Sequence, residues 1–313
     1  MLLTEFPDLS WLKTQIASNF HEQKTWTGEH LDQKGWPTVV LNVQSQHTVR
    51  EDIQGTLSIF NNFSGESRIK TEEKEVILRP GQSFITNQDQ HYSLYIDPLS
   101  SAETFNVHLG TNKIDEFMAQ IAPSEVDLLE PINDQIRINF HNKIHELPNL
   151  QHLLQRLKWS YGCGNLYPLI QEELYAEIMQ VMLLEEKLIR ARMLEIPAVK
   201  KAVKIELGKR LINVVDYMYS HYSKEITLEA LSEQAFLSKY HFLRLFKTYF
   251  GQSPHQFLTK IRINRAKDLL INTSNSIHQI AYAIGIQNPS SFTRLFNQKV
   301  GIGPNNFRLS HRK

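Results

Sequence analysis

Apolar residues near the end of the chain recur at helical spacing, and polar residues mark where each helix begins. Residues 277–284 carry isoleucine or alanine at i, i+3, i+4 and i+7, which places them on one helical face. Ser276 precedes this face and Gln279 follows three residues later, which is a capping-box pattern. Gly285 suits a helix C-terminus, and Asn288-Pro289 suits the start of another helix. The pattern predicts two short helices joined by a tight turn.

An earlier segment shows the same pattern. Residues 242–257 and 292–307 agree at seven of 16 positions at an offset of 50, where average composition gives about one match by chance. The identical pairs are Phe242/Phe292, Arg244/Arg294, Leu245/Leu295, Phe246/Phe296, Gly251/Gly301, Pro254/Pro304 and Phe257/Phe307. Upstream, residues 228–235 give the first short helix, and Ser238 is the expected cap of the second. Two short helices around such a turn form a helix-turn-helix, whose second helix enters the DNA major groove.

A longer helical pattern joins the two copies. It begins at Ser253-Pro254 and continues to about Asn272, with apolar residues around much of its circumference. Such a helix can pack against both copies and is about 27 Å long. We therefore expect a duplicated helix-turn-helix domain, whose two recognition helices can meet successive major-groove segments on one face of DNA.

The N-terminal part of the sequence is rich in β-forming residues and favours strands over helices. Short β-rich segments separated by turn residues predict a small β-barrel or sandwich. These segments are 38–43, 55–60, 75–78, 83–85 and 104–109, with a tight turn at 79–82.

From Lys113 onward helical patterns dominate. Residues 148–161 and 168–193 each predict one helix, and Glu195-Ile196-Pro197 marks a linker to the C-terminal domain. Apolar residues of the second helix recur near a spacing of three to four: Leu169, Ile170, Leu174, Ile178, Val181, Met182, Leu188 and Ile189. They can pack on the chain's own β domain, form a dimer seam, or do both.

Charge divides the chain in the same place. Residues 206–313 hold 15 Lys and Arg against 6 Asp and Glu, a net charge of +9, whereas the preceding residues hold 19 against 27, a net of −8. A basic domain neutralises DNA phosphates and releases counterions, so the C-terminal domain is the one expected to bind nucleic acid.

Composition narrows the class of protein further. No stretch of apolar residues approaches the length of a membrane helix, and the first residues lack the features of a signal peptide. The single cysteine, Cys163, cannot form an intramolecular disulfide, and we expect it to be a small, partly buried apolar residue. These features indicate a cytoplasmic protein.

The outward faces of the two second helices are the expected DNA contacts, since their apolar faces turn inward. The candidates are Tyr240, His241, Leu243, Arg244 and Lys247 in the first copy, and Ser290, Ser291, Thr293, Arg294 and Asn297 in the second. Arginine pairs bidentately with guanine, serine and threonine contact bases or phosphates, and a leucine can touch a thymine methyl group. Lys247, Lys299, Arg262, Arg265 and Lys267 are expected at phosphates. Alternatively, the two arginines are solvated or pair with nearby carboxylates.

These residues resemble a known family. The segments ITLEALSEQAFLSKYHFLRLFKTYFGQSPHQFLTKIRINRAKDLL and SIHQIAYAIGIQNPSSFTRLFNQKVGIGPNNFR look like the AraC/XylS family of bacterial transcription regulators, over roughly residues 205–310. The resemblance implies two helix-turn-helix units, joined by a helix, that read adjacent major-groove segments. It implies base contacts by Tyr240, Leu243 and Arg244 in the first unit and by Ser290, Ser291 and Arg294 in the second.

Three positions depart from the family's pattern. Phe236 stands in the first turn, where the family often has glycine, and leaves that turn's backbone geometry open. Gly285-Ile286 replaces the usual Gly-Phe and preserves burial. Pro289 occupies a position where relatives can carry a polar base-reading side chain, so one contact is lost there.

The resemblance also implies a fold for the remainder. We expect an α+β multidomain chain, with a cupin-like sensor barrel in residues 1–125 and a helical dimerisation and linker segment in 126–204. Residues 205–313 would form the all-α DNA-binding domain. The expected partners are double-stranded DNA, a small-molecule effector in the barrel, RNA polymerase and a second copy of the chain.

Function is expected to be ligand-responsive activation of transcription, without catalysis, cofactor or metal. Metal-dependent cupins use a His-x-His pair and a nearby Glu, whereas His91 and His108 are isolated in this sequence. Two alternatives stay open. One is a metal-dependent cupin enzyme fused to a DNA-binding domain, and the other is a dimeric regulator without an effector.

Overall fold

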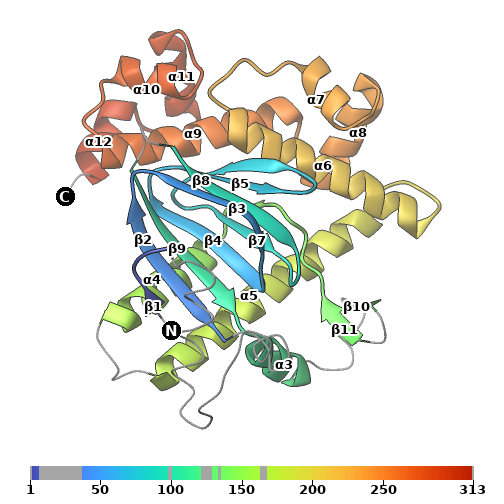
Figure 1. Ribbon diagram of the computed structural model, residues 1–313. Coiled ribbons are helices and arrows are strands. Elements are labelled where there is room, and N and C mark those ends of the chain that lie inside the picture. The colour runs from blue at the N-terminus through green and yellow to red at the C-terminus, as the bar shows by residue number, and fades with distance from the viewer. Residues whose placement is uncertain are drawn as a thin grey trace, which may run out of the picture. The chain divides into compact units, whose positions relative to one another are not determined.

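The computed structural model describes residues 2–6, 37–97, 101–120, 129–132, 135–162 and 168–311. Cys163 lies outside the described residues, so the expectation for it is untested. The chain divides into two compact units, Met1–Ile189 and Arg190–Lys313 (Figure 1). Among the helices that the structure describes, none is long and apolar enough to cross a membrane.

The first unit contains two main sheets. One has six strands in the order β1 (Leu2–Leu3), β2 (Val39–Ser45), β9 (Ala102–Leu109), β4 (Leu57–Ser64), β7 (Ser83–Thr86) and β12 (Ile144–His145). The other has four strands in the order β3 (Thr48–Gln54), β8 (His91–Ile96), β5 (Ser67–Thr71) and β6 (Glu75–Leu78). Neighbouring strands are antiparallel except for the parallel pair β1–β2.

These sheets correct the expected closed barrel. The described strands form two sheets that are hydrogen-bonded within themselves, each with its own edge strands, and no ring of hydrogen bonds closes around the unit. The strand predictions for β2, β4, β6, β7 and β9 are confirmed, as is the turn in which the Gln82 N–H donates to the Arg79 carbonyl. Most of the second sheet was not predicted. Its strand β3 carries three consecutive charged residues and an irregularity at Asp52, which has a φ of +48°.

Strand alternation sorts the side chains of the six-stranded sheet. Phe105 and Val107 of β9, with Ile59 of β4, belong to one apolar core with α4 (Pro148–Gly162) and α5 (Pro168–Leu194). The alternate residues of the same strands point to the opposite face, as the two-residue period of a strand requires. The bounds predicted for both helices are confirmed to within one residue at each end.

The segment predicted to be helical from Lys113 onward also contains strands. After α3 (Thr111–Gln120) comes an antiparallel hairpin of β10 (Leu129–Ile132) and β11 (Gln135–Ile138), and then β12. In α5, several of the residues considered for a dimer seam are instead buried in the unit's own core. Leu174, Ile178, Met182 and Ile189 are at most 2% exposed.

The second unit consists of seven helices among the residues described. They are α6 (Lys201–His221), α7 (Leu228–Gln234), α8 (Lys239–Phe250), α9 (Pro254–Asn272), α10 (Ile277–Ala283), α11 (Pro289–Val300) and α12 (Pro304–His311). The predicted caps form: Ser253 with Gln256 and Ser276 with Gln279 both make complete capping boxes. The duplicated pattern of short helices around a central helix is therefore confirmed.

Candidate nucleic-acid interface

The second helix of each copy begins and ends in the same way. Ser238 caps α8 by accepting a hydrogen bond from the His241 N–H, and Asn288 caps α11 by accepting from two backbone N–H groups. Each helix ends at a glycine with positive φ, +70° at Gly251 and +88° at Gly301. These local signals fix the length of both helices and hence which residues they can present.

The turns before these helices also match, despite the phenylalanine in the first. Phe236 has a φ of +55° and Gly285 a φ of +77°, so both are left-handed. The next backbone N–H closes the turn with an equivalent hydrogen bond in each copy. Leu237 N–H donates to the Ser232 carbonyl at 3.0 Å, and Ile286 N–H donates to the Ala281 carbonyl at 2.9 Å. Phe236 thus adopts the conformation that glycine takes in the second turn.

Repeated aromatic residues hold the two copies in one geometry. In the first copy, the ring centroids of Phe242 and Phe246 lie 5.5 Å apart, and those of Phe246 and Phe257 lie 5.7 Å apart. The equivalent separations in the second copy, among Phe292, Phe296 and Phe307, are 5.6 Å and 5.5 Å. Edge-on contacts of this kind stabilise the core beyond their buried area. They confirm that the phenylalanine faces are core and leave the opposite faces to solvent.

The predicted contact residues lie on those solvent faces. In α8, Tyr240, Leu243, Arg244 and Lys247 are exposed, whereas His241 is half-buried. All the second-copy candidates are exposed on α11: Ser290, Ser291, Thr293, Arg294 and Asn297. Four of them, all except Ser291, line a groove together with Pro289, residues 301–303 and Asn306. Each copy therefore presents most of its predicted contact residues on one exposed helix face.

The cations on these faces have no partners within the described part of the chain. There, the side chains of Arg244, Lys247 and Arg294 form no ion pair or hydrogen bond. Lys239 shows the contrast, because its ammonium pairs with Glu229 of α7. The alternative that the two arginines pair with nearby carboxylates finds no support among these residues.

Arg262, expected at a phosphate, has a different role. Its Nε and one terminal nitrogen each lie 2.9 Å from a carbonyl oxygen, of Tyr222 and Lys224 respectively. Burial lowers its pKa, although an arginine stays charged at neutral pH. Arg308 acts similarly, donating to the carbonyls of Leu270 and Asn275. These two arginines tie helix ends together, a role that the sequence did not indicate.

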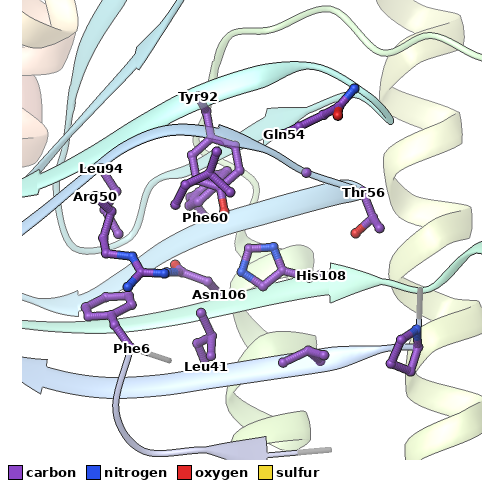
Figure 2. A pocket seen from close by; sticks show the side chains of 14 residues that line it. Phe6, Leu41, Arg50, Gln54, Thr56, Phe60, Tyr92, Leu94, Asn106 and His108 are labelled. Atoms are coloured by element: carbon purple, nitrogen blue, oxygen red, sulfur yellow. The ribbon is translucent and has the colours of Figure 1, made fainter. Parts of the chain in front are cut away.

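The first unit contains a cavity lined by residues of β2, β3, β4, β8 and β9 (Figure 2). His108 lines it and accompanies Phe60, Tyr92 and Asn106. His91 lies elsewhere and pairs with Asp52 at 2.7 Å. Over the described ranges, no group of three or more His, Cys, Asp or Glu residues is arranged to hold a metal ion.

Residues 231–310 match the family model described as a helix-turn-helix domain. LumQ of Photobacterium leiognathi, named a probable transcriptional regulator, is 25% identical over 254 residues, or 80% of this chain and 88% of LumQ. The chain is a DNA-binding transcription regulator with a C-terminal helix-turn-helix domain. An uncharacterised HTH-type transcriptional regulator of Haemophilus influenzae is 25% identical, over 79% of this chain and 84% of that protein.

Some relatives match a shorter part of the chain. The lactose operon transcription activator of Staphylococcus xylosus is 33% identical over 96 residues, or 31% of this chain and 34% of that protein. The chain thus spans about a third of that relative but most of LumQ. The relatives that align with most of the chain are named regulators rather than enzymes.

Proposed function

We propose that this regulator reads two adjacent major-groove segments, one with α8 and one with α11. The observation that carries the proposal is the equivalence of Arg244 and Arg294. They occupy the same position in two copies of one fold, both are exposed, and neither has a partner in the described residues. An unpaired guanidinium on a recognition helix is suited to bidentate pairing with guanine.

Neighbouring side chains supply the remaining contacts. Tyr240 and Leu243 flank Arg244 on the exposed face of α8, and Leu243 can contact a thymine methyl group. Ser290 and Ser291 flank Arg294 and offer hydroxyl groups to bases or phosphates. His241, Thr293 and Asn297 complete the faces, and Lys247 and Lys299 neutralise phosphates.

The test is selection of DNA fragments by the full chain, followed by binding to the selected site at fixed salt. Arg244→Ala and Arg294→Ala are each expected to lose about 1–3 kcal/mol of binding and to relax specificity at separate positions. Gln298→Ala, at an exposed position one turn beyond Arg294, is the matched control. Wild-type affinity in both arginine variants would contradict the proposed interface.

The first unit is proposed to be a cupin-like sensor that makes the regulator ligand-responsive. Residues of both sheets line the cavity described above, and such cavities commonly hold small molecules. The proposed division is a sensor in residues 1–125, a dimerisation and linker segment in 126–204 and the DNA-binding domain in 205–313. In this scheme the protein acts where the DNA is, in the cytoplasm, as an activator that contacts RNA polymerase.

Dimerisation is proposed to use the exposed face of α5. Leu184 and Leu188 lie one helical turn apart, and their side chains are 59% and 44% exposed. Val181, half-buried, lies on the same side one turn earlier. Val181 also packs against the unit's own core, whereas Leu184 and Leu188 lie outside that core cluster.

Light scattering on the full chain measures its oligomeric state and so tests whether Leu184 and Leu188 form a dimer interface. Leu184→Glu with Leu188→Glu is expected to convert a dimer to a monomer at micromolar concentration, because burying two carboxylates opposes association. Val49→Glu, at an exposed apolar position on β3, serves as the control. A wild-type monomer, or a double variant that stays dimeric, would contradict this role for α5.

A further inference from the structure

The cavity in the first unit lies between the two sheets and receives side chains from both. Asn106 and His108 of β9 point into it, while Phe105 and Val107 of the same strand join the core formed with the helices. Arg50 of β3 and Tyr92 of β8 enter from the other sheet. Figure 2 shows the Arg50 side chain extending from its strand toward the level of Phe6 and Asn106. The cavity therefore combines apolar walls with a few polar groups.

Among the described residues that line the cavity, one carries a formal charge at neutral pH. These residues include no Asp, Glu or Lys, and the ionisable ones are Arg50, Tyr92 and His108. Burial lowers the pKa of His108 to about 4 and raises that of Tyr92, so both are neutral. Within the described residues Arg50 has no ion pair. A half-buried cation without a counter-ion is unfavourable, and an anionic ligand would relieve that cost.

Two further polar groups in the lining lack partners. Asn106 is 1% exposed, and its Oδ1 accepts a hydrogen bond from the Asn61 N–H at 3.3 Å, which fixes the amide. Its Nδ2 and the hydroxyl of Thr56 are buried without a hydrogen-bond partner among the described residues. Buried polar groups nearly always have partners, so these two atoms indicate that a ligand atom or water completes them.

The hydrogen bonds of Ser58 select one tautomer of the neutral His108 ring. Ser58 Oγ donates to the Thr56 carbonyl at 2.8 Å and lies 2.8 Å from His108 Nδ1. Because the serine has a single proton, Nδ1–H of the neutral ring donates to the hydroxyl, which leaves Nε2 as an acceptor. Because burial keeps the ring neutral, the imidazole adds no second positive charge to the cavity.

We infer that this cavity binds a small organic acid, whose carboxylate pairs with Arg50 and whose apolar body packs against Leu41, Phe60 and Leu94. The amide of Asn106 donates to the same ligand. This inference rests on the proposed function, in which the first unit senses a small molecule, and names the chemical class of that molecule.

Titration calorimetry on the full chain tests the class of ligand. The probes are benzoate, phenylacetate and octanoate, each with its neutral amide and its amine counterpart. At least one acid is expected to bind at least tenfold more tightly than its amide and its amine. Arg50→Gln is expected to remove that preference, and Arg50→Lys is expected to keep part of it. Arg68→Gln changes a half-buried guanidinium outside the cavity lining that pairs with Glu75 and Asp97, and should leave acid binding unchanged.

Three results would overturn the inference. They are the absence of acid binding at millimolar concentration, amides that bind as tightly as acids, and an acid preference that survives in Arg50→Gln. Thermal melts of each variant verify folding, and Arg50→Lys keeps the test decisive if the glutamine variant unfolds.

DNA binding with and without each compound separates this inference from the proposed function. An acid that binds through Arg50 without altering DNA affinity or transcription would leave the inference standing and contradict ligand-responsive regulation. If an amine or amide binds and alters DNA affinity while acids do not bind, ligand-responsive regulation stands and the inference of an acid ligand is contradicted.

Discussion

The two helix-turn-helix copies share an interior and differ on the surface. Their phenylalanine cores have nearly equal ring separations, and their turns close with equivalent hydrogen bonds. On the exposed faces, Tyr240 and Leu243 of α8 stand where α11 has Ser290 and Thr293. Close packing allows little change in the buried side chains of either copy. The exposed side chains of each copy only have to match the DNA segment that the copy reads. The duplicated fold is thus expected to read an asymmetric site.

The turns differ in how tightly they are held. A Cβ atom added at Gly285 would lie 2.7 Å from the Ser223 carbonyl oxygen and 2.9 Å from that of Tyr222. At the equivalent position of the first copy, Phe236 is 79% exposed and its ring lies 5.8 Å from the Arg210 guanidinium. The second turn is therefore packed against the chain that follows α6, and the first turn faces solvent.

The largest effect is expected for Gly285→Ala. The substitution adds a left-handed backbone cost of about 1–2 kcal/mol and a contact with backbone that cannot move easily, so about 2–4 kcal/mol of stability should be lost. Gly301→Ala is the matched control, since Gly301 also has positive φ but nothing lies within 4 Å of an added Cβ. Denaturant unfolding of the two variants should differ by more than 1 kcal/mol, and equal losses would contradict the difference between the turns.

A smaller effect is expected from making the two faces alike. Tyr240→Ser combined with Leu243→Thr gives α8 the side chains that α11 has at those positions. We expect about 1–2 kcal/mol weaker binding to the selected site, with altered base preference in the segment read by α8 alone. Fragment selection with this variant provides the measurement. Changed preference in both segments would show that the copies do not read DNA independently.

The salt dependence of DNA binding by Lys247→Ala tests whether α8 makes a phosphate contact that α11 lacks. Removing one phosphate contact should weaken binding by less than about 1 kcal/mol for every sequence and reduce the salt slope by about 1. Asn297 occupies the equivalent position in α11, so Asn297→Ala is expected to leave the salt slope unchanged. An unchanged slope for Lys247→Ala would remove that residue from the phosphate contacts.

The smallest effect is expected for Phe236→Gly. Glycine removes the cost of a left-handed phenylalanine, and about 0.5–1 kcal/mol of stability should be gained. The ring is exposed, so little packing is lost. Thermal unfolding of the variant checks the sign, and a loss of stability would mean that the contact with Arg210 outweighs the backbone strain.

Features set by neighbouring residues could be predicted from the sequence, and features set by distant ones could not. Ser276 with Gln279, and Asn288 with Pro289, announce helix starts over a few residues, and both form as expected. Arg262 was expected at a phosphate because its partners lie about 40 residues earlier in the chain, at Tyr222 and Lys224. Nothing in its local sequence indicates those carbonyls.

Contacts between distant residues also explain why the first unit was only partly predicted. Strands β2, β4, β6, β7 and β9 were predicted, whereas β8 was not, although apolar residues alternate along it. Strand β3 was not predicted because it carries three consecutive charged residues and pairs with a distant strand, β8. Arg50 belongs to one sheet and Asn106 and His108 to the other, and only the arrangement of the two sheets brings them into one cavity. That cavity therefore could not be predicted from the sequence.

The central helix α9 has a consequence for the target sites themselves. Its 19 residues span about 28 Å and join the two reading helices without a flexible connection. A base substitution in the site alters one contact, but an inserted base pair moves a whole segment about 3.4 Å along the duplex and also rotates it. The natural DNA sites read by one chain should therefore differ in base sequence but keep a constant length. Variation in spacing should occur only between the site read by one protomer and the site read by its partner.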